Sequence, residues 1–243
     1  MRGEVGGQTT GSSDTAAEAA RRVSSFPYFS SGSKAVDELL GGGYRAGRLT
    51  EVFGRSNSGK TQLAMQAALV AARGGNRSLF IDTEGSFRPE RMEEMARARG
   101  WKAEGLLEKV VYVRSDSSAE QMETIRKMNS RGATASCALV IIDTLTRNFS
   151  VDLPGRSNLS SRQGALDVHL SEMARDAYLR GRAYLLTNRV TFGTLHDVGV
   201  GGRTVEQLVH SSVRLEKEGG RIRATALPSG RSVVTEVGTA GVA

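Results

Sequence analysis

The sequence predicts an α/β fold with a mostly parallel central sheet and an antiparallel C-terminal extension. Between residues 49 and 187, short and nearly continuous apolar runs alternate with helical segments, which is typical of parallel strands buried on both faces. The last three apolar runs instead follow one another through short glycine-containing turns, as antiparallel strands do. Because the 243 residues contain no internal repeat, we expect one α/β domain over residues 26–243.

Residues 1–25 are predicted to form a disordered tail and a short linker helix ahead of this domain. Residues 1–14 consist mainly of glycine, serine, threonine and charged residues, so they can bury little apolar surface. Thr15 and Glu18 have the spacing of a capping box, which indicates a helix that ends near Arg22.

Helices and strands then alternate along the chain. A helix from Ser33 is stopped by three glycines at 41–43, and Pro89 stands at the first position of a later helix, where its missing N–H leaves no hydrogen bond unmade. The expected helices cover residues 33–40, 62–72, 90–99, 118–130 and 159–179. The expected strands cover residues 49–53, 77–82, 110–114, 137–143, 183–187, 211–217, 221–227 and 231–237.

The composition excludes several classes of protein. No apolar run approaches the roughly 18 residues of a membrane-spanning helix, and the N-terminus lacks the apolar core of a signal peptide, so we expect a cytoplasmic protein without a membrane partner. Cys137 is the single cysteine, which excludes an internal disulfide, and the three histidines lack the spacing of a zinc site. The net charge of +7 suits a polyanionic partner, although solubility alone would explain it equally well.

The strand at 49–53 leads directly into a glycine-rich motif, G-x-x-x-x-G-K-[ST]. Glycines let backbone N–H groups turn inward around phosphate oxygens, and the start of the next helix adds a positive dipole. We expect Lys60 to reach the β- and γ-phosphates of a nucleotide and the Thr61 hydroxyl to hold magnesium. The alternative is a chance glycine loop, which is disfavoured because the motif stands between a predicted strand and a predicted helix. The residues of the motif are Gly54, Arg55, Ser56, Asn57, Ser58, Gly59, Lys60 and Thr61.

Two acidic residues at strand ends complete the predicted site. Asp143 follows four apolar residues and could be the second magnesium anchor. Glu84 follows the strand at 77–82 and so projects from the carboxyl edge, where open α/β sheets bind ligands and a carboxylate could activate water. Each would be an ordinary strand-end or solvated acid on its own. Beside the glycine loop they indicate nucleotide hydrolysis.

Six segments match the sequence pattern of a known family. They read S-G-S-K-A-V-D-E-L-L-G-G-G from residue 31, L-T-E-V-F-G from 49, S-G-K-T-Q from 58, I-D-T-E-G-S-F-R-P-E-R from 81, G-R-S-N-L-S-S-R-Q from 155 and L-T-N-R-V from 186. In these segments the chain resembles the archaeal and eukaryotic RecA-like strand-exchange recombinases, in particular their RadA branch. The resemblance covers about residues 31–237.

The resemblance implies a RecA-like P-loop ATPase core with ATP and Mg²⁺ as cofactors. It gives Glu84 the role of the water-activating glutamate and adds Gln62 and Arg91 to the nucleotide contacts, with the planar Arg91 guanidinium stacked on adenine. Residues 148–161 and 191–202 would be two loops that bind single-stranded DNA. A solvated charged loop is the alternative interpretation of the arginines expected to contact DNA phosphates, which are Arg147, Arg156 and Arg162.

Two positions depart from the family pattern that links nucleotide to DNA. Arg189 stands where the family has a glutamine that senses the γ-phosphate, and Gln207 stands where a histidine follows the Gly-Gly pair. An arginine only donates hydrogen bonds and carries a fixed charge. Arg189 could clamp the γ-phosphate or a neighbour's nucleotide, or bind DNA phosphate, and relaxed constraint explains the change equally well. Our hypothesis is that hydrolysis is weak and little stimulated by DNA, so that ATP binding serves mainly as a structural or assembly signal.

Further departures favour an accessory role. About 30 residues precede the core, so we expect the family's N-terminal helical DNA-binding domain to be absent, and F-P-Y-F at 26–29 only approximates the F-x-x-A segment that docks neighbouring subunits. These features resemble archaeal RadB-type paralogs. The sequence therefore predicts a nucleoid-associated paralog that binds ATP and single-stranded DNA and assists the main RadA-type recombinase, or another paralog, in homologous recombination and repair. The alternatives are an active strand-exchange recombinase, a KaiC-like regulatory ATPase without DNA, and a scaffold with a dead nucleotide site.

Overall fold

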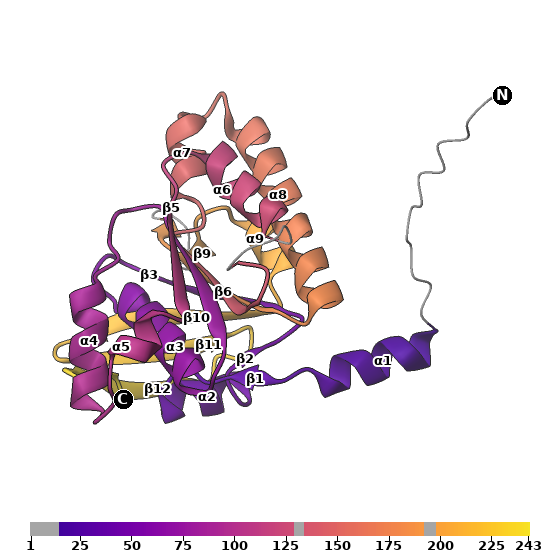
Figure 1. Ribbon diagram of the computed structural model, residues 1–243. Coiled ribbons are helices and arrows are strands. Elements are labelled where there is room, and N and C mark those ends of the chain that lie inside the picture. Colours follow the sequence, from indigo (N-terminus) through magenta and orange to yellow (C-terminus); the bar gives the residue numbers. More distant parts are fainter. Residues whose placement is uncertain (1–14, 129–133, 192–197) are drawn as a thin grey trace.

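The structure is a computed structural model that describes residues 15–128, 134–191 and 198–243 (Figure 1). Over these residues, the centre is a nine-stranded sheet with the order β13-β12-β11-β10-β3-β7-β6-β4-β5. The strands from β10 to β5 run parallel, and β11, β12 and β13 continue the sheet in antiparallel pairs. The predicted α/β fold, with a mostly parallel sheet and an antiparallel C-terminal extension, is therefore confirmed.

Eight of the nine strands lie close to where the sequence predicts them, and the ninth, at residues 241–242, was not predicted. Their bounds are Leu49–Gly54 (β3), Arg77–Asp82 (β4), Val110–Arg114 (β5), Cys137–Asp143 (β6), Ala183–Asn188 (β7), Ser211–Glu218 (β10), Arg221–Leu227 (β11), Ser232–Gly238 (β12) and Gly241–Val242 (β13). One difference concerns β10, which pairs with β3 in parallel and so belongs to the parallel part of the sheet. The antiparallel extension therefore begins at β11, one strand later than the short turns in the sequence suggest.

Helices cover both faces of the sheet. One face carries α2 (Lys34–Leu40), α3 (Lys60–Arg73), α4 (Pro89–Ala98) and α5 (Glu104–Leu107). The other carries α6 (Ser118–Lys127), α7 (Arg147–Asp152), α8 (Leu159–Arg180) and α9 (Arg203–Leu208). In β4, Phe80 packs in the first layer, and its neighbours Leu79 and Ile81 pack in the second. Burial on both faces explains why the central strands are continuous apolar runs.

Several short elements escape prediction because two residues cannot show a periodic pattern. They form two small ribbons, one of β1 (Tyr28–Phe29) with β2 (Tyr44–Arg45) and one of β8 (Val190–Thr191) with β9 (Val198–Gly199). The predicted helix over 118–130 ends at Lys127, and its last two predicted residues, 129 and 130, lie outside the described residues.

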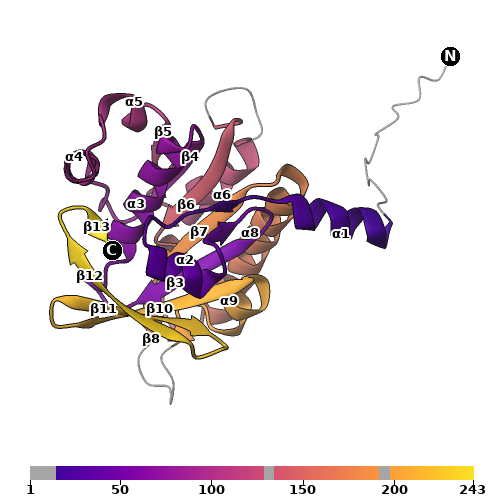
Figure 2. The ribbon, with the colours of Figure 1, turned by 90° about the horizontal axis from the view of Figure 1, so that it is seen from below.

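The predicted linker helix is present as α1 (Ala16–Ser25). The Thr15 hydroxyl accepts a hydrogen bond from the Glu18 N–H at 3.3 Å, and the Thr15 N–H donates to the Glu18 carboxylate at 2.8 Å, which completes the capping box. None of the α1 residues is buried, and the helix projects away from the sheet in two perpendicular views (Figures 1 and 2). The predicted tail, residues 1–14, lies outside the described residues.

Candidate nucleotide-binding site

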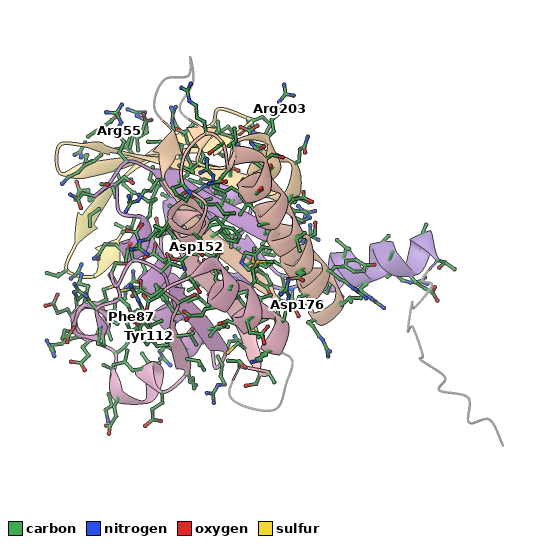
Figure 3. The ribbon with its side chains drawn as sticks, turned by 90° about the horizontal axis from the view of Figure 1, so that it is seen from above. Arg55, Phe87, Tyr112, Asp152, Asp176 and Arg203 are labelled. Atoms are coloured by element: carbon green, nitrogen blue, oxygen red, sulfur yellow. The ribbon has the colours of Figure 1, made fainter. Side chains whose placement is uncertain are left out.

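The carboxyl ends of neighbouring parallel strands form the edge that carries the predicted site. The register sets Asp82 of β4 opposite Asp143 of β6. The segments that follow these strands therefore lie at the same edge, with the glycine loop after β3, Glu84 after β4 and Arg189 after β7. Figure 3 labels Arg55 of the glycine loop at this end of the molecule.

The glycine loop turns tightly between β3 and α3. Gly59 has a φ of +96° and Asn57 a φ of +63°, both in the left-handed region. A Cβ on Gly54 would lie 2.3 Å from the carbonyl oxygen of Leu215 in β10, so only glycine lets these strands approach so closely. Ser58 Oγ is buried and has no hydrogen-bond partner within the described part of the chain. The loop thus combines the tight turn of a phosphate-binding loop with an unused polar atom inside it.

Lys60 begins α3, two residues earlier than predicted, and its side chain folds back into the loop. Its Nζ donates to the carbonyl oxygens of Gly54 at 2.9 Å and Arg55 at 2.8 Å. Burial lowers the pKa of Lys60, and the negative charges of Asp143 and Glu84 oppose that shift. A phosphate group at this place would favour the charged form of Lys60 in the same way.

Asp143 is buried at the end of β6 among hydroxyl groups. Its Oδ2 accepts hydrogen bonds from Thr61 Oγ1 at 2.8 Å and Ser86 Oγ at 2.9 Å, and its Oδ1 accepts one from the Thr187 hydroxyl. Burial raises the pKa of Asp143, and these three hydrogen bonds oppose the shift. The two residues predicted to hold magnesium are therefore in contact. Ser86 and Thr187 were not predicted from the sequence, because their place beside Asp143 depends on strand register.

Glu84 lies on a tight turn that Asp82 holds in place. The Asp82 carboxylate accepts hydrogen bonds at 2.8 to 3.2 Å from the backbone N–H groups of four consecutive residues, 84–87. Because Asp82 is fully buried, it replaces the water that would otherwise satisfy these groups. From the sequence, Asp82 was predicted only as the last residue of a strand. The sequence signal for its role in the turn is an aspartate directly before a turn that contains glycine.

Arg189 contacts Glu84 at this edge of the sheet. Arg189 Nη2 lies 2.8 Å and Nε lies 3.1 Å from Glu84 Oε1. Gln207, the other predicted relay residue, is exposed on α9 and has no hydrogen bond to Arg189 among the residues described. The structure brings Arg189 to Glu84 and does not bring it to Gln207.

Arg91 and Gln62, both predicted to contact the nucleotide, lie in contact with each other. Arg91 Nε donates to Gln62 Oε1 at 2.9 Å, and its two terminal nitrogens donate to the carbonyl oxygens of Thr239 at 3.1 Å and Gly238 at 2.7 Å. A further bond joins Nη1 to Glu94 Oε2 at 3.0 Å, so these contacts use the N–H donors at the edge of the planar guanidinium group.

A hollow of about 500 Å³ opens beside the glycine loop. One wall consists of residues 57–62, and the opposite wall is the hairpin between β10 and β11, including Lys217 and Arg221. Lys217 and Arg221 were not predicted from the sequence, because the hairpin lies beside the glycine loop only in the folded chain. The hollow is therefore lined by several groups suited to an anionic ligand.

The arginines predicted to contact DNA differ in their surroundings. Arg156 is exposed between α7 and α8. Arg147 Nη1 donates to Asn148 Oδ1 at 3.2 Å, and Arg162 Nη1 donates to the carbonyl oxygen of Leu153 at 2.8 Å. Two of the three guanidinium groups thus already bind the protein itself.

Both predicted DNA-binding loops overlap regular elements within the described residues. The prediction of a loop over residues 148–161 is wrong for most of that length, because α7 and the start of α8 occupy it. A helix forms there because Phe149 is buried and the Asn148 side chain donates to two carbonyl oxygens after β5. In the second predicted loop, residues 192–197 lie outside the described residues, and the flanking residues form the β8–β9 ribbon.

The described ranges contain no helix long and apolar enough to cross a membrane. They also contain no group of three or more histidine, cysteine or acidic side chains that could hold a metal by themselves. A magnesium ion at Asp143 would therefore take hydroxyl, water and phosphate oxygens as its other ligands, which suits its preference for hard oxygen donors and retained water.

A mostly parallel sheet with a glycine-rich strand-to-helix turn at its carboxyl edge defines a phosphate-binding α/β protein, and this arrangement is consistent with a RecA-like core. Comparison with known proteins agrees, since the Rad51 family matches residues 22–224. The DNA repair and recombination protein RadA of Metallosphaera sedula is 34% identical in an alignment 243 residues long, gaps included. The alignment covers 93% of this chain and 75% of that protein. The chain belongs to the Rad51 family of RecA/RadA-type recombinases, whose members are ATPases of DNA recombination and repair that use ATP and Mg²⁺.

Proposed function

We propose that the chain is an ATP-binding paralog of the RadA-type recombinases, which binds single-stranded DNA and hydrolyses ATP weakly with Mg²⁺. Residues 26–243 would act as one ATPase domain. The observation that carries this proposal is the contact between Thr61 and Asp143, with Lys60 inside the adjoining glycine loop and Glu84 on the neighbouring turn. Polar side chains of this kind gather at the carboxyl edge of an α/β sheet where a ligand binds.

The glycine loop would bind the triphosphate. Its backbone N–H groups and the N-terminus of α3 attract phosphate oxygens, and Lys60 would exchange its two carbonyl partners for the β- and γ-phosphates. Thr61 and Asp143 would hold Mg²⁺, which neutralises phosphate charge when it is bound. The face of the Arg91 guanidinium would stack on adenine, with Gln62 beside it.

Glu84 is the proposed general base. Its carboxylate would accept a proton from the water that attacks the γ-phosphorus. A new phosphorus–oxygen bond forms as the bond to the β–γ bridging oxygen breaks, which gives ADP and phosphate. The turn held by Asp82 would keep Glu84 at the reaction side of the site.

Single-stranded DNA is the proposed polyanionic partner. The net charge of +7 and the exposed position of Arg156 support it. Arg147 and Arg162 would contribute by exchanging their present partners for phosphate. The proposed protein partner is the main RadA-type recombinase or another paralog.

The first test is Lys60→Ala, with Lys34→Ala as the control because Lys34 is an exposed lysine on α2. We expect Lys60→Ala to weaken ATP binding by at least about tenfold, or about 1.4 kcal/mol, since the phosphates lose their buried positive charge. Titration with a fluorescent ATP analogue measures binding, phosphate release measures turnover, and thermal unfolding shows that both variants fold. Nucleotide binding and hydrolysis that both survive in Lys60→Ala would contradict the proposal.

Two further observations separate the proposed role from its alternatives. Filaments of the chain alone with ATP and DNA, seen by electron microscopy, would indicate a strand-exchange recombinase instead of an accessory paralog. A DNA titration without binding, together with normal ATP binding, would indicate a regulatory ATPase that acts on proteins.

A further inference from the structure

The ion pair between Glu84 and Arg189 lies inside the proposed reaction site. One carboxylate oxygen, Glu84 Oε1, is within hydrogen-bonding distance of both Nη2 and Nε of Arg189, at 2.8 and 3.1 Å. The register of β3 and β7 sets Asn188, the residue before Arg189, opposite Phe53, the residue before the glycine loop that holds Lys60. The pair therefore lies near the lysine that would bind the terminal phosphates.

Both partners are presented by fixed backbone. Glu84 lies on the turn that Asp82 holds. On the other strand, the Arg189 N–H donates to Asn188 Oδ1 at 2.9 Å, and the Arg189 carbonyl oxygen accepts from the Val200 N–H at 2.8 Å. The backbone segments at the ends of β4 and β7 therefore bring the two side chains within reach of each other.

This contact affects the chemistry expected of Glu84. A general base needs a carboxylate oxygen that is free to accept a proton from water. An oxygen that already interacts with two charged N–H donors is not free for water, and the side chain is turned toward the arginine. In this arrangement one oxygen of the carboxylate, Oε1, is engaged before substrate arrives.

From this geometry we infer that Arg189 is a positioning residue that holds Glu84 in a resting arrangement and so limits the rate of hydrolysis. The inference rests on the proposed function, because it assigns a regulation to the same site. The pair is only partly shielded, with 54% of the Arg189 side chain and 24% of the Glu84 side chain exposed. An ion pair this accessible to water opens readily, so the restraint on Glu84 is partial.

The test compares steady-state ATP hydrolysis by the full chain and by substituted forms. We expect Arg189→Gln to raise kcat about three- to tenfold and to leave KM unchanged, because a neutral amide releases the carboxylate without touching the nucleotide. Arg189→Lys should keep the slow rate, since an ammonium group also pairs with Glu84. Arg203→Gln, an exposed arginine on α9, serves as the matched control and should leave kcat as it is.

A double substitution shows whether the added rate passes through Glu84. Glu84→Gln and Glu84→Gln with Arg189→Gln should be equally slow, whereas a purely structural effect of Arg189 would change the rate in both backgrounds. A kcat for Arg189→Gln at or below that of the parent overturns the inference, as does a rise in KM, which would place Arg189 on the nucleotide.

The outcomes also distinguish this inference from the proposed function. If the parent binds ATP through Lys60 but Arg189→Gln is no faster, or if neither form hydrolyses the bound ATP, the inference fails and ATP binding stands. If neither form binds ATP in the titration, the proposed function has failed at its first step, and the inference falls with it.

Discussion

Glu51 is a buried acid close to the nucleotide edge of the sheet. Its Oε1 accepts a hydrogen bond from Asn188 Nδ2 at 2.8 Å, and a Cβ on Gly199 in β9 would lie 2.4 Å from the same oxygen. Burial raises the pKa of Glu51 to about 7, and its hydrogen bonds with Asn188 and Ser212 oppose the shift. The protonated form is therefore favoured in the folded chain at acid pH.

This raised pKa predicts a dependence of stability on pH. The stabilising effect is fully present below the ordinary pKa of 4.5 and is lost as the pH rises through about 7. Glu51→Gln copies the protonated form, so the variant should match the parent near about pH 4 and be more stable by on the order of 3 kcal/mol at about pH 8. Urea unfolding of both proteins at each pH measures the difference. A constant offset between them would show that Glu51 titrates normally.

At the scale of elements, the turn between β4 and α4 depends on one buried carboxylate. Asp82 serves four backbone N–H groups and also accepts a hydrogen bond from the Tyr112 hydroxyl at 3.3 Å. The Tyr112 ring stacks on Phe87 with centroids 4.7 Å apart, and Figure 3 shows these two side chains together. The aromatic pair and the carboxylate thus fix the same turn, which carries Glu84.

Asp82→Asn tests this turn. The amide keeps the size of the side chain but replaces one acceptor oxygen by a donor, so buried N–H groups lose their partner. We expect a loss of about 2–3 kcal/mol in the free energy of unfolding and a lower kcat, because Glu84 loses its fixed place. Urea unfolding and hydrogen exchange of the amides of residues 84–87 measure both effects on the turn.

Asp116→Asn is the matched control for this substitution. Asp116 follows the neighbouring strand β5 and accepts a hydrogen bond from Arg114 Nε at 2.7 Å, but it is exposed. We expect this change to alter stability by less than about 1 kcal/mol. Equal losses in the two variants would mean that the turn does not depend on the Asp82 hydrogen bonds.

At the scale of the whole molecule, binding of single-stranded DNA should weaken steeply with salt. Each phosphate contact contributes about −0.7 to the slope of log affinity against log salt concentration. We expect Arg156→Ala to flatten the slope by about that amount, because this side chain is exposed. Arg162→Ala should have less effect, since Arg162 already donates to the Leu153 carbonyl oxygen.

Fluorescence titrations of a labelled oligonucleotide at several salt concentrations measure these slopes. The control is Arg97→Ala, an exposed arginine near the end of α4, which we expect to keep the slope of the parent. If Arg156→Ala and Arg97→Ala give the same slope, the DNA contacts lie elsewhere on the molecule.

Local sequence signals were enough to predict most of the helices and strands and the family. Strand bounds at β4, β5 and β6 agree with the prediction, because strands buried on both faces form apolar runs with clear ends. The glycine loop and the capping box of α1 are equally local signals. The helix α7 was missed because it forms where Asn148 and Phe149 find buried partners, which local sequence does not reveal.

Contacts between side chains that are distant in sequence depend on the folded sheet. Thr61 contacts Asp143 and Arg189 contacts Glu84 across 82 and 105 residues of sequence. Which of these side chains meet depends on the order and register of the parallel strands, because the sequence alone leaves open which strands become neighbours in the sheet. The glycine loop could therefore be read from sequence, whereas the pairing of Arg189 with Glu84 required the folded sheet.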